Sequence, residues 1–367
     1  MKTRDFDYHL PKEQIAQQPL PQRDASRLLV LHKESGQIEH RVFTDLQAYL
    51  DPGDIMVVND SRVFPARLYG RKVTGGRVEL LLLERIDGGR WKALVGGKRL
   101  TAGTRILVDA SDGSQSGWTA EVTAVLEGPL REIQFDRPLD EALDRLGHTP
   151  LPPYIHEPLQ DTERYQTVYS RPVGSAAAPT AGLHFTGDSL IDLRNRGVLF
   201  ETSTLHVGLD TFKPVEVEQV HDHDIHSEWA RLTPQSARRI NEAKLAGGRL
   251  VAVGTTAVRT LETGALRSAG IKGTLQTISR RDAEGETRNL CPWKPVSAFE
   301  GTTDLFIVPG YKFRAVDIMI TNFHLPKSSL IMLVAAFAGL DNTLRAYETA
   351  IVENYRFYSF GDAMLII

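Results

Sequence analysis

Residues 165–186 combine side chains that can do chemistry with a backbone that can approach a ligand closely. Prolines and glycines interrupt this segment too often for a helix or a regular strand, and three consecutive alanines leave little bulk in its middle. Small residues expose backbone N–H and C=O groups to a bound molecule. We therefore expect a ligand here, with an ordinary surface connection as the alternative. The polar side chains of the segment include Tyr165, Tyr169, Arg171, Ser175, Thr180 and His184.

Three further loops follow apolar, strand-like runs, and ligands in open α/β sheets collect beyond the carboxyl ends of the strands. One loop contains Thr255 and Thr256 and enters a segment that carries Arg259. Free N–H groups and hydroxyls there can hold a carboxylate or a phosphate, or the threonines only cap a helix. The other two loops are residues 321–324, with Thr321, Asn322 and His324, and residues 205–208, with His206 and Gly208.

A histidine-rich segment, residues 221–228, has the composition of a metal site. Its three histidines and three acids can supply imidazole and carboxylate ligands. The spacing is neither that of an HExxH helix nor that of a zinc module with cysteines. A solvated polar loop is the alternative, so a metal-dependent hydrolase that uses residues 221–226 stays open at this point.

Basic residues gather locally although the formal net charge is only -3. That charge argues against a generally basic nucleic-acid binder, but it does not exclude a local basic face. Each basic group can neutralise a phosphate or belong to a solvated surface. One such stretch contains Arg62, Arg67, Arg71, Lys72 and Arg77.

Composition and length limit the classes to which this protein can belong. The 367 residues are 41% hydrophobic and 24% charged, as in a globular protein with a substantial core, and the length favours two domains. The single cysteine, Cys291, excludes an intrachain disulfide and a thiolate metal cage. The N-terminal residues lack the apolar core of a signal peptide, and the most apolar run, residues 330–340, is shorter than the roughly 20 residues of a spanning helix. We expect a cytoplasmic protein with no membrane partner.

Strand and helix patterns alternate at both ends of the chain and must position these groups. A strand is expected at residues 27–32, buried strands at residues 55–59 and 250–253, and a helix at residues 43–50. Thr186 is expected to cap one helix and Ser328 or Ser329 another, largely buried one.

The middle of the chain has a different pattern. From about Tyr69, five short strand-like runs are separated by glycine-bearing turns, which favours a small antiparallel barrel or sandwich, and residues 139–147 are expected to close it as a helix. We predict a discontinuous α/β domain with a mixed sheet, residues 1–68 and 152–367, and an inserted small antiparallel β-barrel domain, residues 69–151.

Several long motifs of unusual composition identify a resemblance. They are NDSRVFPARL, LPPYI, ERYQTVYSRPVGSAAAPTAGLHFT, TLHVG, HSEWA, VGTTAVRTLE and TNFHLPKSSLIMLVAAFAG. Together they closely resemble the S-adenosylmethionine:tRNA ribosyltransferase-isomerase family of queuosine biosynthesis. The match runs from DFDYHLP to YRFYSFGDAMLI, and residues 69–151 are its least matched part. A G-x-G-x-x-G loop is absent, which argues against a Rossmann methyltransferase or dehydrogenase.

The resemblance implies an unusual reaction in which S-adenosylmethionine is a consumed co-substrate. Its ribosyl part is transferred to 7-aminomethyl-7-deazaguanine at the wobble position of a tRNA with a GUN anticodon, and is isomerised to give epoxyqueuosine. Adenine and methionine leave. The resemblance implies no metal, and we expect a monomer. The alternatives are a non-catalytic tRNA- or RNA-binding protein, the metal-dependent hydrolase and an ordinary methyltransferase.

The implied chemistry suggests roles for titratable residues in the matching motifs. The sulfonium acidifies the ribose C5′–H bonds, so a base can open the ring, and the departing adenine needs a proton or a strong hydrogen bond. We assign these roles, as hypotheses, among His184, His206 and Glu228, with His324 in reserve.

Substrate binding is assigned in the same way. Tyr165 and Tyr169 are expected to stack on a base, and Asn59 with Arg62 to bond a base edge or a phosphate. Thr255, Thr256 and Arg259 suit the methionine carboxylate or an RNA phosphate. The other predicted binding residues are Arg67, Ser175, Thr180, Gly182, Gly208, Thr321 and Asn322.

Two positions depart from the family pattern. Asp210 stands where a glycine is expected, so a loop that needs positive φ is altered or a carboxylate is added. Ser175 stands where several relatives carry a small apolar residue.

Overall fold

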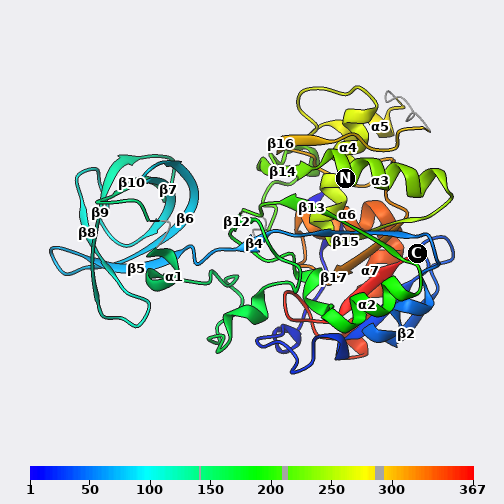
Figure 1. The fold of residues 1–367 in the computed structure, drawn as a ribbon, viewed down its shortest axis with the longest axis horizontal. Coiled ribbons are helices and arrows are strands. Elements are labelled where there is room, and N and C mark those ends of the chain that lie inside the picture. The colour runs from blue at the N-terminus through cyan, green and yellow to red at the C-terminus, as the bar shows by residue number, and fades with distance from the viewer. Residues whose placement is uncertain (140–141, 209–213, 286–292) are drawn as a thin grey trace. The chain divides into compact units, whose positions relative to one another are not determined.

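The computed structural model describes residues 1–139, 142–208, 214–285 and 293–367. The chain divides into two compact units (Figure 1). The α/β unit consists of Met1–Arg62, Pro153–Pro172 and Ala178–Ile367, and the barrel unit of Val63–Pro152 and Val173–Ala177. The predicted fold class, a discontinuous α/β domain with a mixed sheet and an inserted antiparallel barrel, is confirmed.

The α/β unit is built on a nine-stranded sheet with the order β16-β14-β13-β3-β15-β17-β18-β1-β2. Its centre is four parallel strands. Three of them are buried along their whole length, as is typical of parallel sheets, whereas the fourth begins at the exposed Leu199. The four are β13 (Leu199–Leu205), β3 (Ile55–Asn59), β15 (Leu250–Val253) and β17 (Ile318–Asn322). The flanking strands are β16 (Phe299–Thr303), β14 (Glu228–Leu232), β18 (Ala363–Ile366), β1 (Arg27–Leu31) and β2 (Ile38–Val42).

One edge of this sheet collects ends from six strands. The carboxyl ends of the four parallel strands meet there. β18 runs antiparallel to β17, with Ala363 beside Asn322, and β1 runs parallel to β18, with Leu28 beside Ala363. The segments that precede β18 and β1 therefore reach the same edge as the loops that follow the parallel strands.

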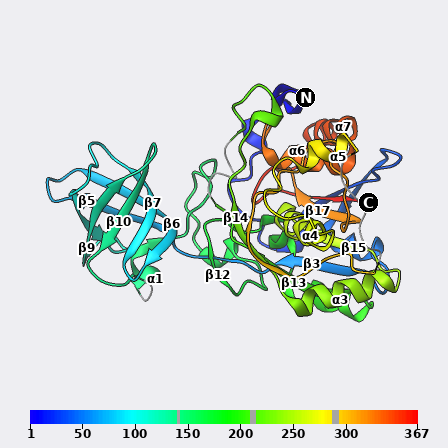
Figure 2. The ribbon, with the colours of Figure 1, turned by 90° about the horizontal axis from the view of Figure 1, so that it is seen from above.

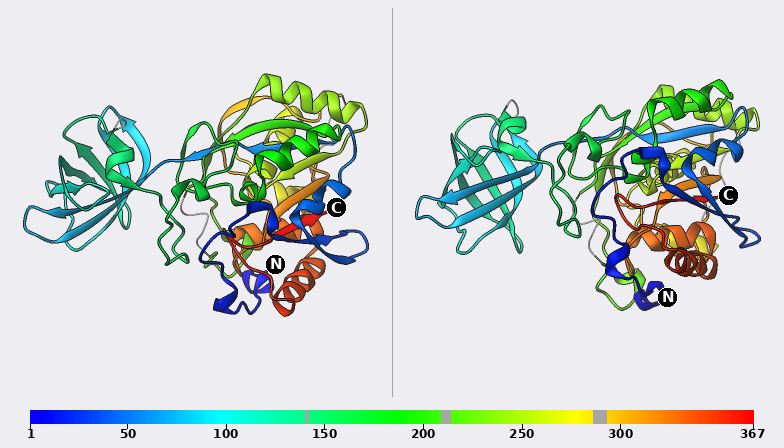
Figure 3. Two further views of the ribbon diagram at one scale, coloured as in Figure 1. Left: turned by 60° about the horizontal axis from the view of Figure 1, so that its bottom comes forward. Right: turned by 90° about the horizontal axis from the view of Figure 1, so that it is seen from below.

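Helices pack against both faces of the sheet (Figures 2 and 3). Alternate strand residues divide between two hydrophobic clusters, one containing Ile55 and Val57 and the other Met56 and Val58. The α-helices of this unit are α2 (Gly187–Asn195), α3 (Pro234–Leu245), α4 (Thr255–Ser268), α5 (Ile278–Ala283), α6 (Ser329–Ala338) and α7 (Leu340–Val352). Its 3-10 helices are η1 (Thr3–Phe6), η2 (Lys12–Gln14), η3 (Arg23–Ala25), η4 (Phe43–Ala48), η6 (Thr162–Tyr165), η7 (Thr180–His184) and η9 (Val220–Asp222).

The predicted helix caps are confirmed, and two predicted helices differ. Thr186 Oγ1 accepts a hydrogen bond from Ser189 N at 3.0 Å, and Ser328 Oγ accepts one from Ile331 N at 3.3 Å. The helix expected at residues 43–50 is present but shorter, as the 3-10 helix η4, whose tight turns suit a six-residue connection. Among the described residues, no single helix is long and apolar enough to cross a membrane; only α6 and α7 taken together, bent by 114°, pass that test.

The barrel unit contains a closed antiparallel sheet with its own hydrophobic core. Its strands in ring order are β5 (Arg67–Lys72), β6 (Arg77–Asp87), β7 (Arg90–Gly96), β10 (Leu130–Phe135), β9 (Gln115–Val125) and β8 (Arg105–Asp109), and β8 pairs with β5 to close the ring. Alternating residues such as Leu80 and Leu82 point into the core. The helix expected at residues 139–147 is limited to α1 (Leu143–Leu146) among the described residues, and β11 (Gly147–His148) then pairs with β5. β4 (Arg62–Val63) and β12 (Val173–Ser175) form a separate two-stranded sheet.

Candidate active site

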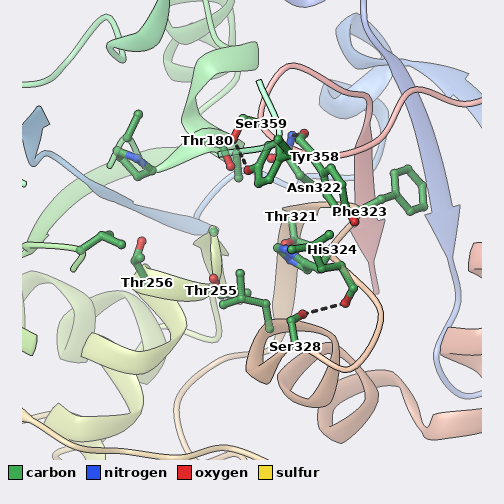
Figure 4. Close-up of a pocket in the computed structure, with 18 residues that line it drawn as sticks. Thr180, Thr255, Thr256, Thr321, Asn322, Phe323, His324, Ser328, Tyr358 and Ser359 are labelled. Atoms are coloured by element: carbon green, nitrogen blue, oxygen red, sulfur yellow. Dashed lines mark hydrogen bonds between the residues drawn. The ribbon is translucent and has the colours of Figure 1, made fainter. Parts of the chain in front are cut away.

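A pocket lies at the edge of the sheet where the parallel strands end (Figure 4), with about 670 Å³ of empty space that includes its opening to solvent. Its walls come from residues 254–256 after β15, residues 321–325 after β17, and Val207 after β13. The segment 178–181, at the start of η7, and the segment that precedes β18 complete the walls. All lining residues belong to the α/β unit. The three loops singled out from the sequence therefore meet in one place.

Different residues lie at the two ends of the pocket. Figure 4 shows Thr180, Asn322, Tyr358 and Ser359 gathered at one end, and Ser328 at the opposite end. Six of the predicted site residues line the pocket. They are Thr180, Thr255, Thr256, Thr321, Asn322 and His324.

The amino end of α4 presents backbone donors to the pocket. Its N-cap, Gly254, makes no side-chain capping bond, so the first-turn N–H groups are not satisfied by a cap. Gly254 has φ +87°, a conformation that favours glycine and turns β15 sharply into the helix. Thr255 and Thr256 are the first two residues of this 14-residue helix. The predicted anion-binding loop is therefore available for a ligand.

Asn59, at the end of β3, has all its polar atoms occupied by protein. Its Nδ2 donates to Leu205 O at 3.0 Å and to Thr256 Oγ1 at 3.1 Å. Its Oδ1 accepts hydrogen bonds from Ser61 N and Leu205 N, both at 3.1 Å. Asn59 thus fixes the ends of two strands and the first turn of α4 to one another, and it does not present a free group to a base edge.

Asn322, the last residue of β17, lines the pocket and is only 2% exposed. Its Nδ2 donates to Tyr358 O at 3.0 Å and lies 3.3 Å from His184 Nε2. Its Oδ1 has no hydrogen-bond partner among the described residues. A buried amide oxygen without a donor is uncommon in folded proteins and indicates a place for a ligand group or water.

His184 lies behind Asn322 and does not line this pocket. Its Nδ1 is 2.8 Å from Ser26 Oγ, and its ring stacks on Phe43 with the centroids 5.1 Å apart. Burial, with smaller contributions from Arg23 and Arg356, lowers its pKa to about 4, so the ring is neutral near pH 7. Because Nε2 accepts from Asn322, we assign the proton to Nδ1, which donates to Ser26.

His324 lies in the pocket wall itself. Its Nε2 is 2.8 Å from Thr321 Oγ1, and its backbone N donates to Tyr347 OH at 3.1 Å. The Tyr8 hydroxyl donates to its carbonyl oxygen. Burial lowers the pKa of His324 to about 3, so this ring is also neutral near pH 7.

His206 sits beside the pocket-lining Val207. Its Nδ1 lies 2.7 Å from Ser61 Oγ, and its ring stacks on Trp229 with the centroids 4.9 Å apart and the planes at 17°. Burial, and then the charge of Arg231, lowers its pKa. These contacts fix the direction of the ring.

Glu228 and Arg259 form a buried ion pair in a second hollow of about 1160 Å³. Glu228 also accepts a hydrogen bond from Gly208 N at 3.0 Å, and Arg259 Nε donates to Leu305 O at 3.1 Å. The charge of Arg259 is thus compensated by a carboxylate within the protein, and Gly208 is held by the same carboxylate. Leu330 lines both hollows.

The histidine-rich segment contributes to the second hollow, which His223 and His226 line. His223 contacts the ring of Phe306 at a centroid distance of 5.4 Å. In the described part of the chain, no group of three or more His, Cys, Asp and Glu side chains is placed to hold a metal ion. Asp210 and Cys291 lie outside the described residues.

Four predicted residues of the segment 165–186 pack within the protein. Tyr165 is fully buried and meets Phe360 edge to face. Tyr169 packs over Gly182, where an added Cβ would lie 2.1 Å from the tyrosine hydroxyl oxygen, so close approach explains this glycine. Ser175 Oγ donates to Ala177 O at 2.6 Å. These residues shape the segment rather than line the pocket.

Two predicted arginines also lie outside the pocket lining. Arg62 donates to Ser170 Oγ at 3.1 Å and forms an ion pair with Glu163. Arg67 lies on β5 of the barrel unit, with Nε 3.1 Å from a Glu79 carboxylate oxygen.

Among the pocket residues that the sequence reasoning missed are Tyr154, Tyr358 and Ser359. The rings of Tyr154 and Tyr358 lie 4.6 Å apart, and Tyr154 OH is 2.8 Å from Ser359 Oγ. Tyr358 has φ +70°, which is uncommon for a residue other than glycine. Tyr154 lies in the motif LPPYI, and Tyr358 and Ser359 lie in YRFYSFGDAMLI, but residue type alone gave them no role in the site. For Tyr358 and Ser359 the missing signal is the antiparallel last strand, which brings the preceding residues to the strand-end loops.

Comparisons with known proteins agree over the whole chain. A family model described as "Queuosine biosynthesis protein" matches residues 3–366. The S-adenosylmethionine:tRNA ribosyltransferase-isomerases of Symbiobacterium thermophilum and Desulforamulus reducens are 52% and 49% identical over 369 residues, covering 100% of each chain. The crystal structure of an S-adenosylmethionine tRNA ribosyltransferase from Thermotoga maritima is similar with a TM-score of 0.52 and 36% identity, covering 99% of this chain and 100% of that chain.

Proposed function

The chain belongs to the queuosine biosynthesis family of S-adenosylmethionine:tRNA ribosyltransferase-isomerases, and we propose the course of its reaction from that membership. The enzyme transfers the ribosyl part of S-adenosylmethionine to 7-aminomethyl-7-deazaguanine at the wobble position of a tRNA with a GUN anticodon. It isomerises the transferred group, so that the tRNA carries epoxyqueuosine, and adenine and methionine are released. We expect it to act as a monomer in the cytoplasm, with no membrane partner and no metal.

The observation that carries this proposal is the pocket at the carboxyl edge of the parallel strands, where apolar walls meet a few convergent polar groups as in small-ligand sites. The uncapped amino end of α4 favours an anion, because its N–H groups and the helix dipole both point a partial positive charge at the ligand. We assign the methionine carboxylate to this helix end. Arg259, which the sequence suggested for the same role, is compensated by Glu228 and is assigned to support instead.

Proton transfer in this pocket falls to His324. Its neutral ring lines the cavity and lies beside Thr321, whereas His184 lies behind the wall. A neutral imidazole can accept the C5′ proton that the sulfonium acidifies, and the imidazolium can then protonate the departing adenine. His206 and Glu228 are assigned to holding the loop of residues 205–208, which supplies Val207 to the pocket.

The second hollow is assigned to the tRNA base. It is adjacent to the first through Leu330 and combines polar side chains, including His223 and His226, with apolar ones. A wobble base must leave the anticodon stack before its aminomethyl group can attack, and such bases are recognised by polar contacts and packing in a cavity.

The test is a complete product analysis. The enzyme is mixed with S-adenosylmethionine and an anticodon stem-loop that carries the modified guanine, with an unmodified stem-loop as the control. We expect adenine, methionine and epoxyqueuosine in equal amounts from the modified RNA alone. In single turnover, His324→Gln is expected to slow adenine release by roughly 10²–10⁴-fold.

Other outcomes would favour the alternatives. Stem-loop binding without adenine release would indicate a non-catalytic RNA-binding protein, and S-adenosylhomocysteine as the product would indicate a methyltransferase. Loss of activity with a chelator would restore the metal-dependent interpretation of residues 221–226. A near wild-type rate for His324→Gln would remove His324 from proton transfer.

A further inference from the structure

One end of the pocket combines an aromatic wall with a buried hydrogen-bond acceptor. Tyr154 and Tyr358 supply the rings, and Asn322 Oδ1 is the acceptor. We propose that this end is a subsite for an aminated nucleobase, with Tyr358 as the stacking surface and Asn322 Oδ1 as the acceptor of an amino N–H, and that His184 and Ser26 are positioning residues for it. The proposal rests on the proposed function, because it says which part of a substrate this end of the pocket takes.

The orientation of the Asn322 amide follows from its partners. Tyr358 O, 3.0 Å from Nδ2, is a carbonyl and can only accept, so the NH₂ group must face it. The second N–H of the same group faces His184 Nε2 at 3.3 Å. The oxygen is left without a protein donor in the described part of the chain. A ligand that supplies an N–H group satisfies this oxygen, whereas one that supplies only acceptors does not.

Tyr358 is held in an unusual conformation by the same amide. Its φ of +70° costs free energy for a bulky residue, and such strain persists only where the surroundings impose it. Its carbonyl accepts from Asn322 Nδ2, and its backbone N donates to Phe323 O at 3.2 Å. Both restraints come from the end of β17. They place the Tyr358 ring beside Tyr154 in the pocket wall.

His184 acts on this subsite through Asn322. Its Nε2 must accept for the amide to stay in place, and its Nδ1 is fixed by Ser26 Oγ at 2.8 Å. Ser26 directly precedes β1, the strand whose amino end reaches this edge of the sheet. Phe43 stacks on the ring and prevents it from turning. A residue in this position can set the orientation of Asn322 without touching the substrate.

An aromatic face with one acceptor matches the chemistry of a base that carries an amino group. Two parts of the substrates have it: the adenine of S-adenosylmethionine and the deazaguanine of the tRNA. The ligands of the test are chosen to separate them. S-adenosylhomocysteine and S-inosylhomocysteine differ in the 6-amino group of the base, and free 7-aminomethyl-7-deazaguanine represents the other source.

Calorimetric titration of the wild-type enzyme gives the first result. If adenine occupies the subsite, S-adenosylhomocysteine binds roughly tenfold or more tightly than S-inosylhomocysteine, since the latter leaves the buried oxygen unpaired. If the deazaguanine occupies the subsite, S-adenosylhomocysteine and S-inosylhomocysteine bind with the same affinity. Free 7-aminomethyl-7-deazaguanine then competes with neither of them. In Tyr358→Asn, the asparagine tolerates positive φ but the ring is removed. This variant lowers the affinity of the ligand that occupies the subsite by roughly 5- to 150-fold. Tyr69→Asn, at a tyrosine 41% exposed on the barrel, is the matched control and changes nothing.

Paired substitutions of His184 separate positioning from catalysis. His184→Gln keeps an acceptor near the place of Nε2, whereas His184→Asn keeps a polar group only near Nδ1. Positioning predicts that the glutamine variant retains the wild-type Kd and KM, and that the asparagine variant raises both about tenfold with a smaller change in kcat. A catalytic proton carrier at His184 would instead lose kcat equally in both variants, with ligand affinity unchanged.

The proposal is overturned if Tyr358→Asn alters the affinity of neither ligand, or if the His184 variants follow the catalytic pattern. The wild-type titrations need no variant, so they stand even if a substitution impairs folding. Product analysis of the wild-type enzyme distinguishes failure of this subsite from failure of the proposed function. Formation of epoxyqueuosine with the overturning pattern rejects only this subsite, whereas its absence rejects the proposed function.

Discussion

His184 and His324 are both buried and both neutral near pH 7, but they face different surroundings. Ser26, Phe43 and Asn322 surround His184, whereas His324 lies in the wall of the pocket beside Thr321. Residue type does not reveal this difference in surroundings. Both residues are histidines, and both lie after short stretches in motifs of the same family. Only the contacts separate a residue that orients another side chain from one that can reach a substrate.

The pKa values of these two histidines predict how stability depends on pH. Each folded-state pKa, about 4 for His184 and about 3 for His324, is below the usual value of 6.5, so the unfolded chain binds more protons in between. The free energy of unfolding therefore falls as pH drops below about 6.5, with a slope of at most about 1.4 kcal/mol per pH unit for each histidine. Urea unfolding of wild type and His324→Gln at pH 7, 6 and 5 should show a shallower fall in the variant. Parallel curves would contradict the prediction.

Secondary-structure elements explain which parts of the site were foreseeable. The strand-end loops with Thr255 and Asn322 were predicted because buried strands have a distinct apolar pattern, and the sheet brings the carboxyl ends of parallel strands together. Tyr358 could not be predicted in this way, because its place depends on β18 running antiparallel to β17, a long-range pairing with no local signal. Tyr165 and Tyr169 were predicted as stacking surfaces from type alone, and burial against Phe360 and Gly182 depends on tertiary packing.

The fold, like the site, divides into parts that the sequence predicts and parts that depend on tertiary packing. The discontinuous α/β domain and the barrel were predicted because period-two strands with glycine turns differ from strand–helix alternation. A helix was expected at residues 43–50, but its 3-10 type was not, since so short a stretch does not define its own hydrogen-bond pattern. Elements with a strong period are thus readable from the sequence, whereas short connections depend on what they pack against.

The link between β14 and α4 is the buried ion pair of Glu228 with Arg259, whose side chains are 5% and 7% exposed. Glu228→Gln leaves the guanidinium uncompensated, and breaking a buried pair in this way costs about 3–5 kcal/mol. Glu201→Gln is the matched control, since Glu201 pairs at 2.8 Å with Arg239, whose side chain is 54% exposed. We expect that control to lose about 1 kcal/mol or less. Urea unfolding of both variants at pH 7 tests this, and equal losses would show that the buried pair is not special.

At the scale of the whole molecule, the two units have separate hydrophobic clusters, and the nine-stranded sheet and the barrel sheet share no strand. The barrel sheet closes on itself by the pairing of β8 with β5, whereas the nine-stranded sheet is open and ends at β16 and β2. All residues that line the pocket and all residues that line the second hollow belong to the α/β unit. A ligand of that site should therefore stabilise one unit and leave the core of the other unaffected.

Scanning calorimetry with S-adenosylhomocysteine tests this independence. A ligand that binds one folded unit raises the temperature at which that unit unfolds, by an amount that grows with ligand concentration. Leu82→Ala removes a fully buried side chain from the barrel core and should cost about 2–5 kcal/mol there, lowering a transition that the ligand does not shift. Leu250→Ala makes the matched change in β15, in the core of the α/β unit, and should lower the transition that the ligand does shift. A single transition that moves as a whole with ligand would contradict the prediction, because the units would then unfold together. A loss of ligand affinity in Leu82→Ala would also contradict it, because the barrel core would then contribute to the free energy of ligand binding.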